Sequence, residues 1–164
     1  MFFSKNECPV PFDQQPFNEY ISLKKSSLFK FSTYSVRKYI TIIFRVFLCL
    51  FILLGFCIYF VFIKINIKNI LFIDNLILNS FFLLIFIRLY LGWSYVFKRL
   101  LSASIFYEES GWYDGQIWIK GADSLIKDRF IGIYNVLPII KKVKYSLVIC
   151  FINYIFNYLL YYFL

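Results

Sequence analysis

Two long uncharged apolar runs constrain this chain more than any other feature of its sequence. Residues 46–63 form a run of eighteen without a charged side chain, and residues 145–164 form a second run of twenty. An α-helix rises about 1.5 Å per residue, so about 20 apolar residues cross the ~30 Å hydrocarbon core of a bilayer. Both runs therefore predict transmembrane helices.

The composition and a third apolar stretch extend this prediction. The chain of 164 residues is 61% hydrophobic and 16% charged, with a mean hydropathy of +0.70. The third stretch begins near Ile70, and its two charges, Asp74 and Arg88, are separated by about 21 Å along a helix, which suits opposite membrane interfaces. We expect a mainly α membrane protein with about three transmembrane helices, at residues 39–63, 70–97 and 145–164.

The distribution of basic residues predicts the orientation of these helices. Six Lys and Arg residues lie within 1–38 and eight within 98–144, but only two within the short connection 64–69. Cytoplasmic-side segments of membrane proteins carry the excess of Lys and Arg. Residues 1–38 and 98–144 should therefore face the compartment of protein synthesis. Because topology explains the net charge of +9, we predict no nucleic-acid partner.

The first 38 residues are expected to form an arm and a surface helix. Pro9, Pro11 and Pro16 disfavour a helix interior and predict an extended arm over residues 1–20. Residues 20–31 show a weak amphipathic pattern whose lysines would face anionic head groups, so membrane lipids are a predicted partner.

The second transmembrane helix is expected to continue a few turns into water. Leu89, Trp93, Val96 and Leu100 recur at helical spacing and predict one apolar helix face, with Arg88, Tyr95 and Arg99 on another arc. Trp93 and Tyr95 occupy positions typical of an aromatic belt at the membrane interface.

The stretch "YEESGWYDGQIWIK" at residues 107–120 predicts a β-hairpin. Residues 104–108 and 116–120 are rich in β-branched and aromatic types, with Gly111, Asp114 and Gly115 suited to the turn. Alternation places Ile117 and Ile119 on one face and Gln116, Trp118 and Lys120 on the other. An amphipathic helix at 123–137 should follow, packed against the hairpin or the membrane surface, with Lys127 and Asp128 in water and a kink or first turn at Pro138.

The sequence excludes several classes of chemistry. It has no His and therefore no imidazole base or ligand, and its four Cys residues form no CxxC pair or zinc-site spacing. Phosphate-binding, dinucleotide-binding and nucleophile-elbow motifs are also missing from the sequence. We predict no catalytic residues, no metal site and no cofactor.

The acids of the hairpin admit two interpretations. Glu108, Glu109 and Asp114 are suited to a hard metal ion or to acid/base work. We favour ion pairs with Arg88, Arg99 or Arg129 that fix the hairpin against the helices.

The aromatic residues also admit two interpretations. Trp112, Tyr113 and Trp118 are suited to stacking on a pigment, a quinone or a partner protein. We favour a role in seating the hairpin at the level of the lipid head groups. Arg88 is interpreted as an interfacial anchor, with a functional intramembrane charge as the alternative.

Four blocks of the sequence resemble a known family. "CPVPFDQQPFNEY" (8–20), "RLYLGWSYVFKRLLSAS" (88–104), "YEESGWYDGQIWIK" (107–120) and "DRFIGIYNVLPI" (128–139) are similar to signature blocks of the membrane-protein family named for hypothetical chloroplast reading frame thirty-six. The chain departs from that pattern where it reads Gly121-Ala122 in place of prolines. The resemblance implies a plastid membrane, with the thylakoid expected and residues 98–144 facing the stroma, but no activity.

Two functions are consistent with these observations. The first is a non-enzymatic accessory, assembly or stabilising factor that offers the 98–144 segment to subunits of a photosynthetic membrane complex. The second is a carrier or enzyme for a lipophilic cofactor, a pigment or quinone. The candidate interaction module comprises Arg88, Trp93, Tyr95, Arg99, Tyr107, Glu108, Glu109, Gly111, Trp112, Tyr113, Asp114, Gly115, Gln116, Trp118, Asp128 and Arg129.

Overall fold

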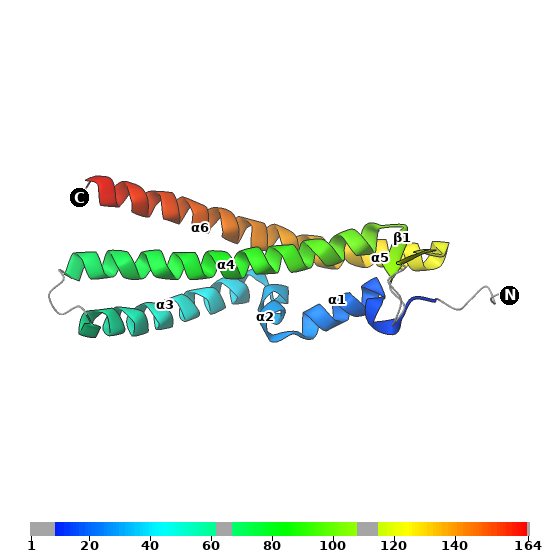
Figure 1. Ribbon diagram of the computed structural model, residues 1–164, viewed down its shortest axis with the longest axis horizontal. Coiled ribbons are helices and arrows are strands. Elements are labelled where there is room, and N and C mark those ends of the chain that lie inside the picture. Colours follow the sequence, from blue (N-terminus) through cyan, green and yellow to red (C-terminus); the bar gives the residue numbers. More distant parts are fainter. Residues whose placement is uncertain (1–8, 62–66, 108–114, 164) are drawn as a thin grey trace.

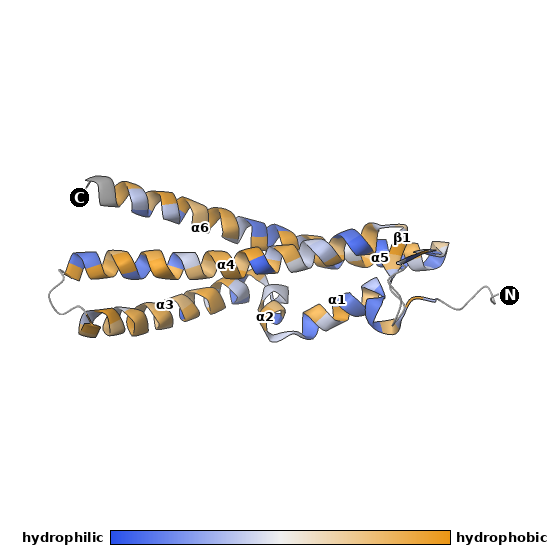
Figure 2. Cartoon of the chain, in the orientation of Figure 1, coloured by the Kyte–Doolittle hydropathy of each residue, from blue (hydrophilic) through white to orange (hydrophobic). Residues whose placement is uncertain are grey.

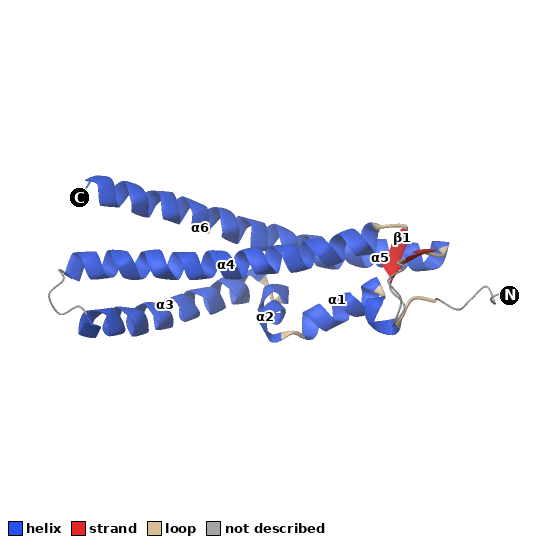
Figure 3. Ribbon diagram, in the orientation of Figure 1, coloured by secondary structure: helices blue, strands red, loops and turns tan. Residues whose placement is uncertain are grey.

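The computed structural model describes residues 9–61, 67–107 and 115–163, with side chains to residue 160. Within these ranges the chain is mainly helical and carries a small two-stranded sheet (Figure 3). The principal elements are α1 (Pro16–Lys25), α2 (Ser27–Lys30), α3 (Val36–Val61), α4 (Ile67–Leu101), β1 (Ser104–Tyr107), β2 (Gln116–Ile119), α5 (Ala122–Ile131) and α6 (Leu137–Phe163).

Helix α4 is the central rod of the molecule. Its 35 residues correspond to a length of about 50 Å. Helix α3 packs along its first half, α1 and α5 along its second half, and α6 diverges from it toward the C-terminal end (Figure 1). The hairpin, α1 and α5 therefore lie at one end of the molecule, and the ends of α3 and α6 lie at the other.

The described residues include three helices that are long and apolar enough to cross a membrane, at Val36–Val61, Ile67–Leu101 and Ala122–Leu160. Apolar residues predominate along α3 and the neighbouring halves of α4 and α6 (Figure 2). Many of them point outward, as Ile52, Phe56 and Phe60 do in α3. The helical fold with three candidate spans agrees with the sequence, and α4 is continuous through the predicted extension to Leu101.

Helices α5 and α6 form one rod, whereas separate helices at 123–137 and 145–164 were expected. A π-helical segment, Gly132–Val136, joins them directly. Pro138 follows two residues later; it has no N–H to donate to the carbonyl of residue 134, and its ring excludes a regular α turn there. The wider π turn accommodates the proline, so the predicted kink is a local change of helical winding.

The extended arm predicted over residues 1–20 is wrong for residues 12–20, and its residues 1–8 lie outside the described ranges. A 3-10 turn occupies Phe12–Gln14, and α1 begins at Pro16. Proline suits the first position of a helix, where no intrahelical N–H donor is needed. The following helix is also not an isolated surface element, because Tyr20 and Phe29 are buried in the core against α4.

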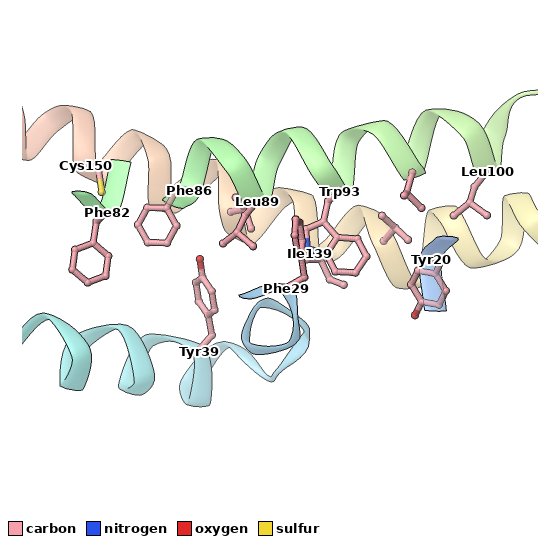
Figure 4. Close-up of a cluster of buried hydrophobic side chains, with 13 residues drawn as sticks. Tyr20, Phe29, Tyr39, Phe82, Phe86, Leu89, Trp93, Leu100, Ile139 and Cys150 are labelled. Atoms are coloured by element: carbon pink, nitrogen blue, oxygen red, sulfur yellow. The ribbon is translucent and has the colours of Figure 1, made fainter. Parts of the chain in front are cut away.

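The core lies along the face of α4 that the sequence predicts. Leu89, Trp93, Val96 and Leu100 are each no more than 1% exposed (Figure 4). Trp93 was expected in an interfacial belt, and its complete burial corrects that interpretation. Its Nε1 donates a hydrogen bond to Ser32 Oγ at 2.9 Å, so the indole N–H is satisfied inside the core.

Gly92 permits the closest packing in this core. A Cβ atom at residue 92 would lie 2.5 Å from the Phe29 ring, well inside van der Waals contact. Phe29 in turn meets Trp93 edge-on, with ring centroids 6.0 Å apart. The missing side chain of Gly92 therefore lets α2 approach α4.

Candidate functional site

We call the end of the molecule formed by α1, α2, residues 88–101 of α4, the hairpin and α5 the head. Its hairpin is antiparallel, with Ile105 opposite Trp118 and Tyr107 opposite Gln116. The predicted hairpin is thus present in strands of four residues each. The residues between the strands, among them the candidates Glu108, Glu109, Gly111, Trp112, Tyr113 and Asp114, lie outside the described ranges.

One face of the hairpin is packed inside the head. Ile105 and Tyr107 are 3% and 5% exposed, and they form a small cluster with Val10 and the half-buried Trp118. The Tyr107 hydroxyl donates a hydrogen bond of 2.6 Å to Gln116 Oε1 across the strands. Trp118 therefore contributes to the packing of the hairpin on the N-terminal segment.

The opposite face of the hairpin is apolar and exposed. Phe106, Ile117 and Ile119 are 68%, 61% and 74% exposed, and Phe106 lies directly opposite Ile117 in the ladder. We call this three-residue surface the outer face. The predicted alternation along β2 is confirmed, but the isoleucines face outward and Lys120 points inward.

Lys120 makes the main polar contacts between the elements of the head. The residue is buried, and its Nζ lies 2.7 Å from Asp128 Oδ2 of α5. The same ammonium donates to the carbonyl oxygens of Arg99 and Leu100 at 3.0 and 3.3 Å. Asp128 is therefore buried in an ion pair, which corrects the expectation that it faces water.

The Lys120 side chain caps the C-terminus of α4. The last four carbonyls of a helix lack intrahelical partners. Besides the two that Lys120 binds, the carbonyl of residue 98 accepts from the backbone N–H of Ser102, and that of residue 101 accepts from Arg129 Nε at 3.4 Å. Positive groups at this end also complement the helix dipole. Arg129 thus contributes to the helix end, and no described acid pairs with it.

Arg99 connects three segments of the head. Its guanidinium forms an ion pair with Glu19 of α1 and donates to the Gln14 carbonyl at 2.8 Å. A longer hydrogen bond of 3.4 Å reaches the carbonyl of Phe106 in β1. The acidic partner of Arg99 among the described residues therefore belongs to α1, whereas the sequence placed it in the hairpin.

The Arg99 pair is partly removed from water. Burial raises the pKa of Glu19 above its ordinary value, and the charge and hydrogen bond of Arg99 oppose this effect. Tyr95 is exposed, and its hydroxyl accepts a 3.0 Å hydrogen bond from Arg99. Arg88 is also exposed, and together with Glu19 and Tyr95 it lines a recess of about 550 Å³ between α1 and α4.

Lys142 links α6 to the segment that precedes α3. Its Nζ donates to the carbonyl oxygens of Ser32 and Tyr34 at 2.9 and 2.7 Å. One turn further along α6, the hydroxyls of Ser146 and Tyr39 share a hydrogen bond of 3.0 Å. These contacts hold α6 against α3 and against the segment before it, where the head meets the candidate spans.

A second cavity lies beyond this junction, between α3, α4 and α6. It measures about 270 Å³, and its walls are mostly apolar. Asn79 lines it and is largely buried, donating to the carbonyl of Cys150 at 3.1 Å. The other lining residues include Tyr39, Phe47, Phe82, Phe86, Ser146, Cys150 and Asn153.

The family model described as CGLD27-like, "Conserved in the green lineage and diatoms 27", matches residues 8–149, which include the whole head and most of the candidate spans. The chain belongs to the CGLD27-like family. The resemblance to the family of hypothetical chloroplast reading frame thirty-six is also confirmed, because curated relatives carry the name ycf36.

Three relatives show the range of this similarity. The chain is 51% identical to the uncharacterized protein ycf36 of Porphyra purpurea, with 87% of each chain covered. It is 43% identical to ycf36 of Cyanophora paradoxa, over 85% of this chain and 89% of that one. It is 41% identical to the chloroplastic protein "conserved in the green lineage and diatoms 27" of Arabidopsis thaliana, over 87% of this chain and 44% of that one. No solved structure matches the chain.

Several residues that build the head were missing from the sequence-based module. Glu19 and Ser32 lie outside the segment that the hairpin motif drew attention to, yet they bind Arg99 and Trp93. Lys120 belongs to the motif and was placed on the correct strand face, but only the structure shows that this face is buried. One signal in the sequence could have indicated this role of Lys120. It is a lysine that alternates with an aromatic residue on a strand close to the end of a helix.

Proposed function

We propose that this chain is an integral chloroplast membrane protein, in the thylakoid, whose head faces the stroma and docks a subunit of a photosynthetic membrane complex. In this proposal it is a non-enzymatic accessory, assembly or stabilising factor. Support for the location comes from three apolar helices of spanning length and from the chloroplast relatives. The concentration of basic residues in and beside the head supports the orientation.

The outer face of the hairpin is the observation that carries the docking role. Phe106, Ile117 and Ile119 present adjacent apolar side chains at the end of the molecule away from α3. Soluble surfaces rarely hold clustered large apolar side chains without a binding function. Strand pairing and the buried Lys120 hold this face in a fixed conformation, which lowers the entropic cost of binding.

Helix α5 and the π-helical segment that follows it offer a second apolar surface. Ile126, Phe130, Ile133 and Tyr134 are all exposed, and the rings of Phe130 and Tyr134 lie 4.4 Å apart. The sequence predicted an apolar stripe here, including Ile126, Phe130 and Ile133, against the hairpin or the membrane surface, and these three side chains are exposed. The stripe is therefore available to the membrane surface or to the same partner.

The docking role is tested by altering the outer face without changing the fold. Ile117→Thr with Ile119→Thr keeps two β-branched residues but removes apolar surface, and Ile117→Val with Ile119→Val is the matched control. After gentle detergent extraction of chloroplast membranes, the wild type and the valine variant should retain identified subunits of one photosynthetic complex. The threonine variant should lose them, and equal retention by all three proteins would exclude the outer face as the docking surface.

A lipophilic cofactor remains a second candidate function, supported by the cavity between α3, α4 and α6. Its aromatic walls, with Asn79 and Asn153 also among the lining residues, suit the ring of a quinone or pigment. Organic extraction and absorption spectroscopy of the purified protein distinguish the two functions. A chromophore or quinone present in stoichiometric amount, and lost in Phe82→Trp, would favour the carrier role.

A further inference from the structure

A recess bordered by lysines opens between the N-terminal helices and the π-helical segment. It measures about 600 Å³. Its apolar lining includes Phe17 from α1 and Ile131 from the end of α5. Its polar lining comes from Tyr20, Lys24, Lys25, Lys30 and Asn135.

The positive charge around this recess has no acidic partner within the described part of the chain. Glu19 of α1 pairs with Arg99, and Asp128 of α5 pairs with Lys120, so both neighbouring acids point elsewhere. A further lysine stands at the rim, because Lys127 Nζ lies 5.4 Å from the centre of the Phe17 ring. Like charges converging on one recess repel one another unless an anion lies between them.

The recess lies close to the beginning of the candidate spans. Lys30 ends α2, and the chain then passes Ser32 and Tyr34, whose carbonyls bind Lys142 of α6. The apolar helix α3 begins immediately afterwards at Val36. Lys30 therefore lies shortly before the first candidate span in the chain, on the side where basic residues of α3 and α6 precede the uncharged runs, and basic residues in that position meet lipid head groups.

We propose that this recess binds the head group of an anionic membrane lipid, a proposal that rests on the proposed membrane location. The three lysines would surround the phosphate or sulfonate group, as basic residues next to a membrane surface do. The exposed amide of Asn135 offers both a donor and an acceptor to head-group hydroxyls. Phe17 and Ile131 supply apolar contact for the glycerol region.

A bound head group would also join parts of the fold that are distant in sequence. The recess is formed on one side by α1 and α2 and on the other by Ile131 and the π-helical segment. An anion there would offset the repulsion between the lysines and hold the N-terminal helices against the rod formed by α5 and α6. Anionic lipid would thus stabilise the head in addition to anchoring it.

The test compares lipid binding by matched variants of the full chain. Lys24→Gln, Lys25→Gln and Lys30→Gln together remove the recess charge, while Lys98→Gln, Lys141→Gln and Lys144→Gln remove the same charge from exposed positions elsewhere. Native mass spectrometry in detergent measures retention of phosphatidylglycerol, phosphatidylcholine and inorganic phosphate. Each recess lysine should contribute about fivefold, so the triple recess variant should bind phosphatidylglycerol on the order of a hundredfold more weakly.

The outcomes separate this proposal from its alternatives. Equal loss in the two triple variants, or no preference of the wild type for phosphatidylglycerol, would overturn the proposal. Binding of inorganic phosphate with the same affinity as the lipid would overturn the assignment to a head group and indicate a free anion.

A second measurement on the wild type guards against misfolding of the recess variant. In nanodiscs, phosphatidylglycerol should protect Lys24, Lys25 and Lys30 from acetylation relative to Lys98, whereas phosphatidylcholine should not; equal labelling in both lipids contradicts the proposal. Resistance of the protein to alkaline extraction from membranes tests the location separately. Release by alkali refutes membrane insertion, while retention without lipid preference refutes only the head-group site.

Discussion

At the scale of single residues, Lys120 explains how a small hairpin is fixed to the end of a long helix. Its ammonium reaches two carbonyls of α4 and the carboxylate of Asp128, so one buried charge satisfies three acceptors from two helices. A buried ion pair is itself weak evidence for stability, because desolvation offsets much of the attraction. The ion pair instead fixes the position of the hairpin, because few other positions of the Lys120 side chain would satisfy all three acceptors.

Removing Lys120 should therefore be costly. Lys120→Met retains the apolar stem but leaves Asp128 buried without its counter-charge, and breaking such a pair costs about 3–5 kcal/mol of the free energy of unfolding. Lys120→Met with Asp128→Asn should recover part of this loss. Thermal unfolding in detergent measures both, with exposed Lys127→Met as the control. Equal effects of the two single lysine variants would contradict the role of Lys120.

Gly92 is predicted to tolerate no side chain. Gly92→Ala places a Cβ atom 2.5 Å from the Phe29 ring, and overpacking of this kind costs about 1–3 kcal/mol. The matched control is Gly115→Ala, because no described atom lies within 4 Å of a Cβ there. Phe29→Leu should be less harmful in the Gly92→Ala background than in the wild type. Additive effects of the two substitutions in thermal unfolding would exclude this contact as the cause.

Glu19 should impose a small pH dependence on the head. Because burial raises its folded-state pKa above 4.5, the folded protein holds a proton between pH 4.5 and that raised value while the unfolded chain releases it. The contribution of Glu19 to stability is then fully present below pH 4.5 and is lost as pH rises through the folded pKa. Glu19→Gln should make the unfolding midpoint less dependent on pH across this window. An unchanged slope in Glu19→Gln would contradict the assignment.

At the scale of elements, asparagines join α4 to α6 within the apolar half of the molecule. Asn75 Nδ2 donates to Asn157 Oδ1 at 2.9 Å, and Asn157 is only 4% exposed. Asn79 makes a second link to the Cys150 carbonyl. Hydrogen bonds between helices in an apolar environment hold pairs together where the hydrophobic effect contributes little. They fix the first turns of α4 to a helix that otherwise diverges from it.

Asn157→Leu should separate these two helices locally. The expected cost is about 1 kcal/mol, because Asn75 then lacks its partner. Asn75→Leu with Asn157→Leu should cost less than the sum of the single changes, since neither polar group is left alone. A double-mutant cycle on unfolding midpoints checks this coupling, and a coupling energy near zero would exclude the pair as a stabilising link. Asn69→Leu, at an exposed position on α4, is the control.

The sequence predicts elements that have a clear hydrophobic period better than it predicts the contacts between those elements. The i, i+4, i+7, i+11 pattern of Leu89, Trp93, Val96 and Leu100 identified the buried face of α4, and strand alternation identified the two hairpin faces. Partners distant in sequence carry no such period. The pairing of Arg99 with Glu19, 80 residues earlier, depends on how α1 packs along α4. Trp93 carried two expectations, the apolar helix face and an interfacial belt, because an indole suits a core and an interface equally, and its burial decides for the core.

At the scale of the whole molecule, the two ends differ in chemistry. The head combines α1, the hairpin and α5 with both of the ion pairs found among the described residues, whereas at the opposite end asparagines join apolar helices and Asp74 of α4 is buried. Helix α4 runs through both ends without interruption. One continuous helix therefore joins the head to the candidate spans.

The chemical difference between the two ends predicts a membrane topology that can be tested. Asp123 in the head and Ile67 at the beginning of α4 are both exposed and lie at opposite ends of the molecule. In a background with the native cysteines replaced, Asp123→Cys should react with a membrane-impermeant thiol reagent from the stromal side of intact thylakoids. Ile67→Cys should react only after the membranes are opened, because positively charged segments stay on the side of synthesis. Equal labelling of both positions from the stromal side would refute an arrangement in which α4 crosses the membrane. Labelling of both in the denatured protein controls for thiol reactivity, so that a difference in intact membranes reports location alone.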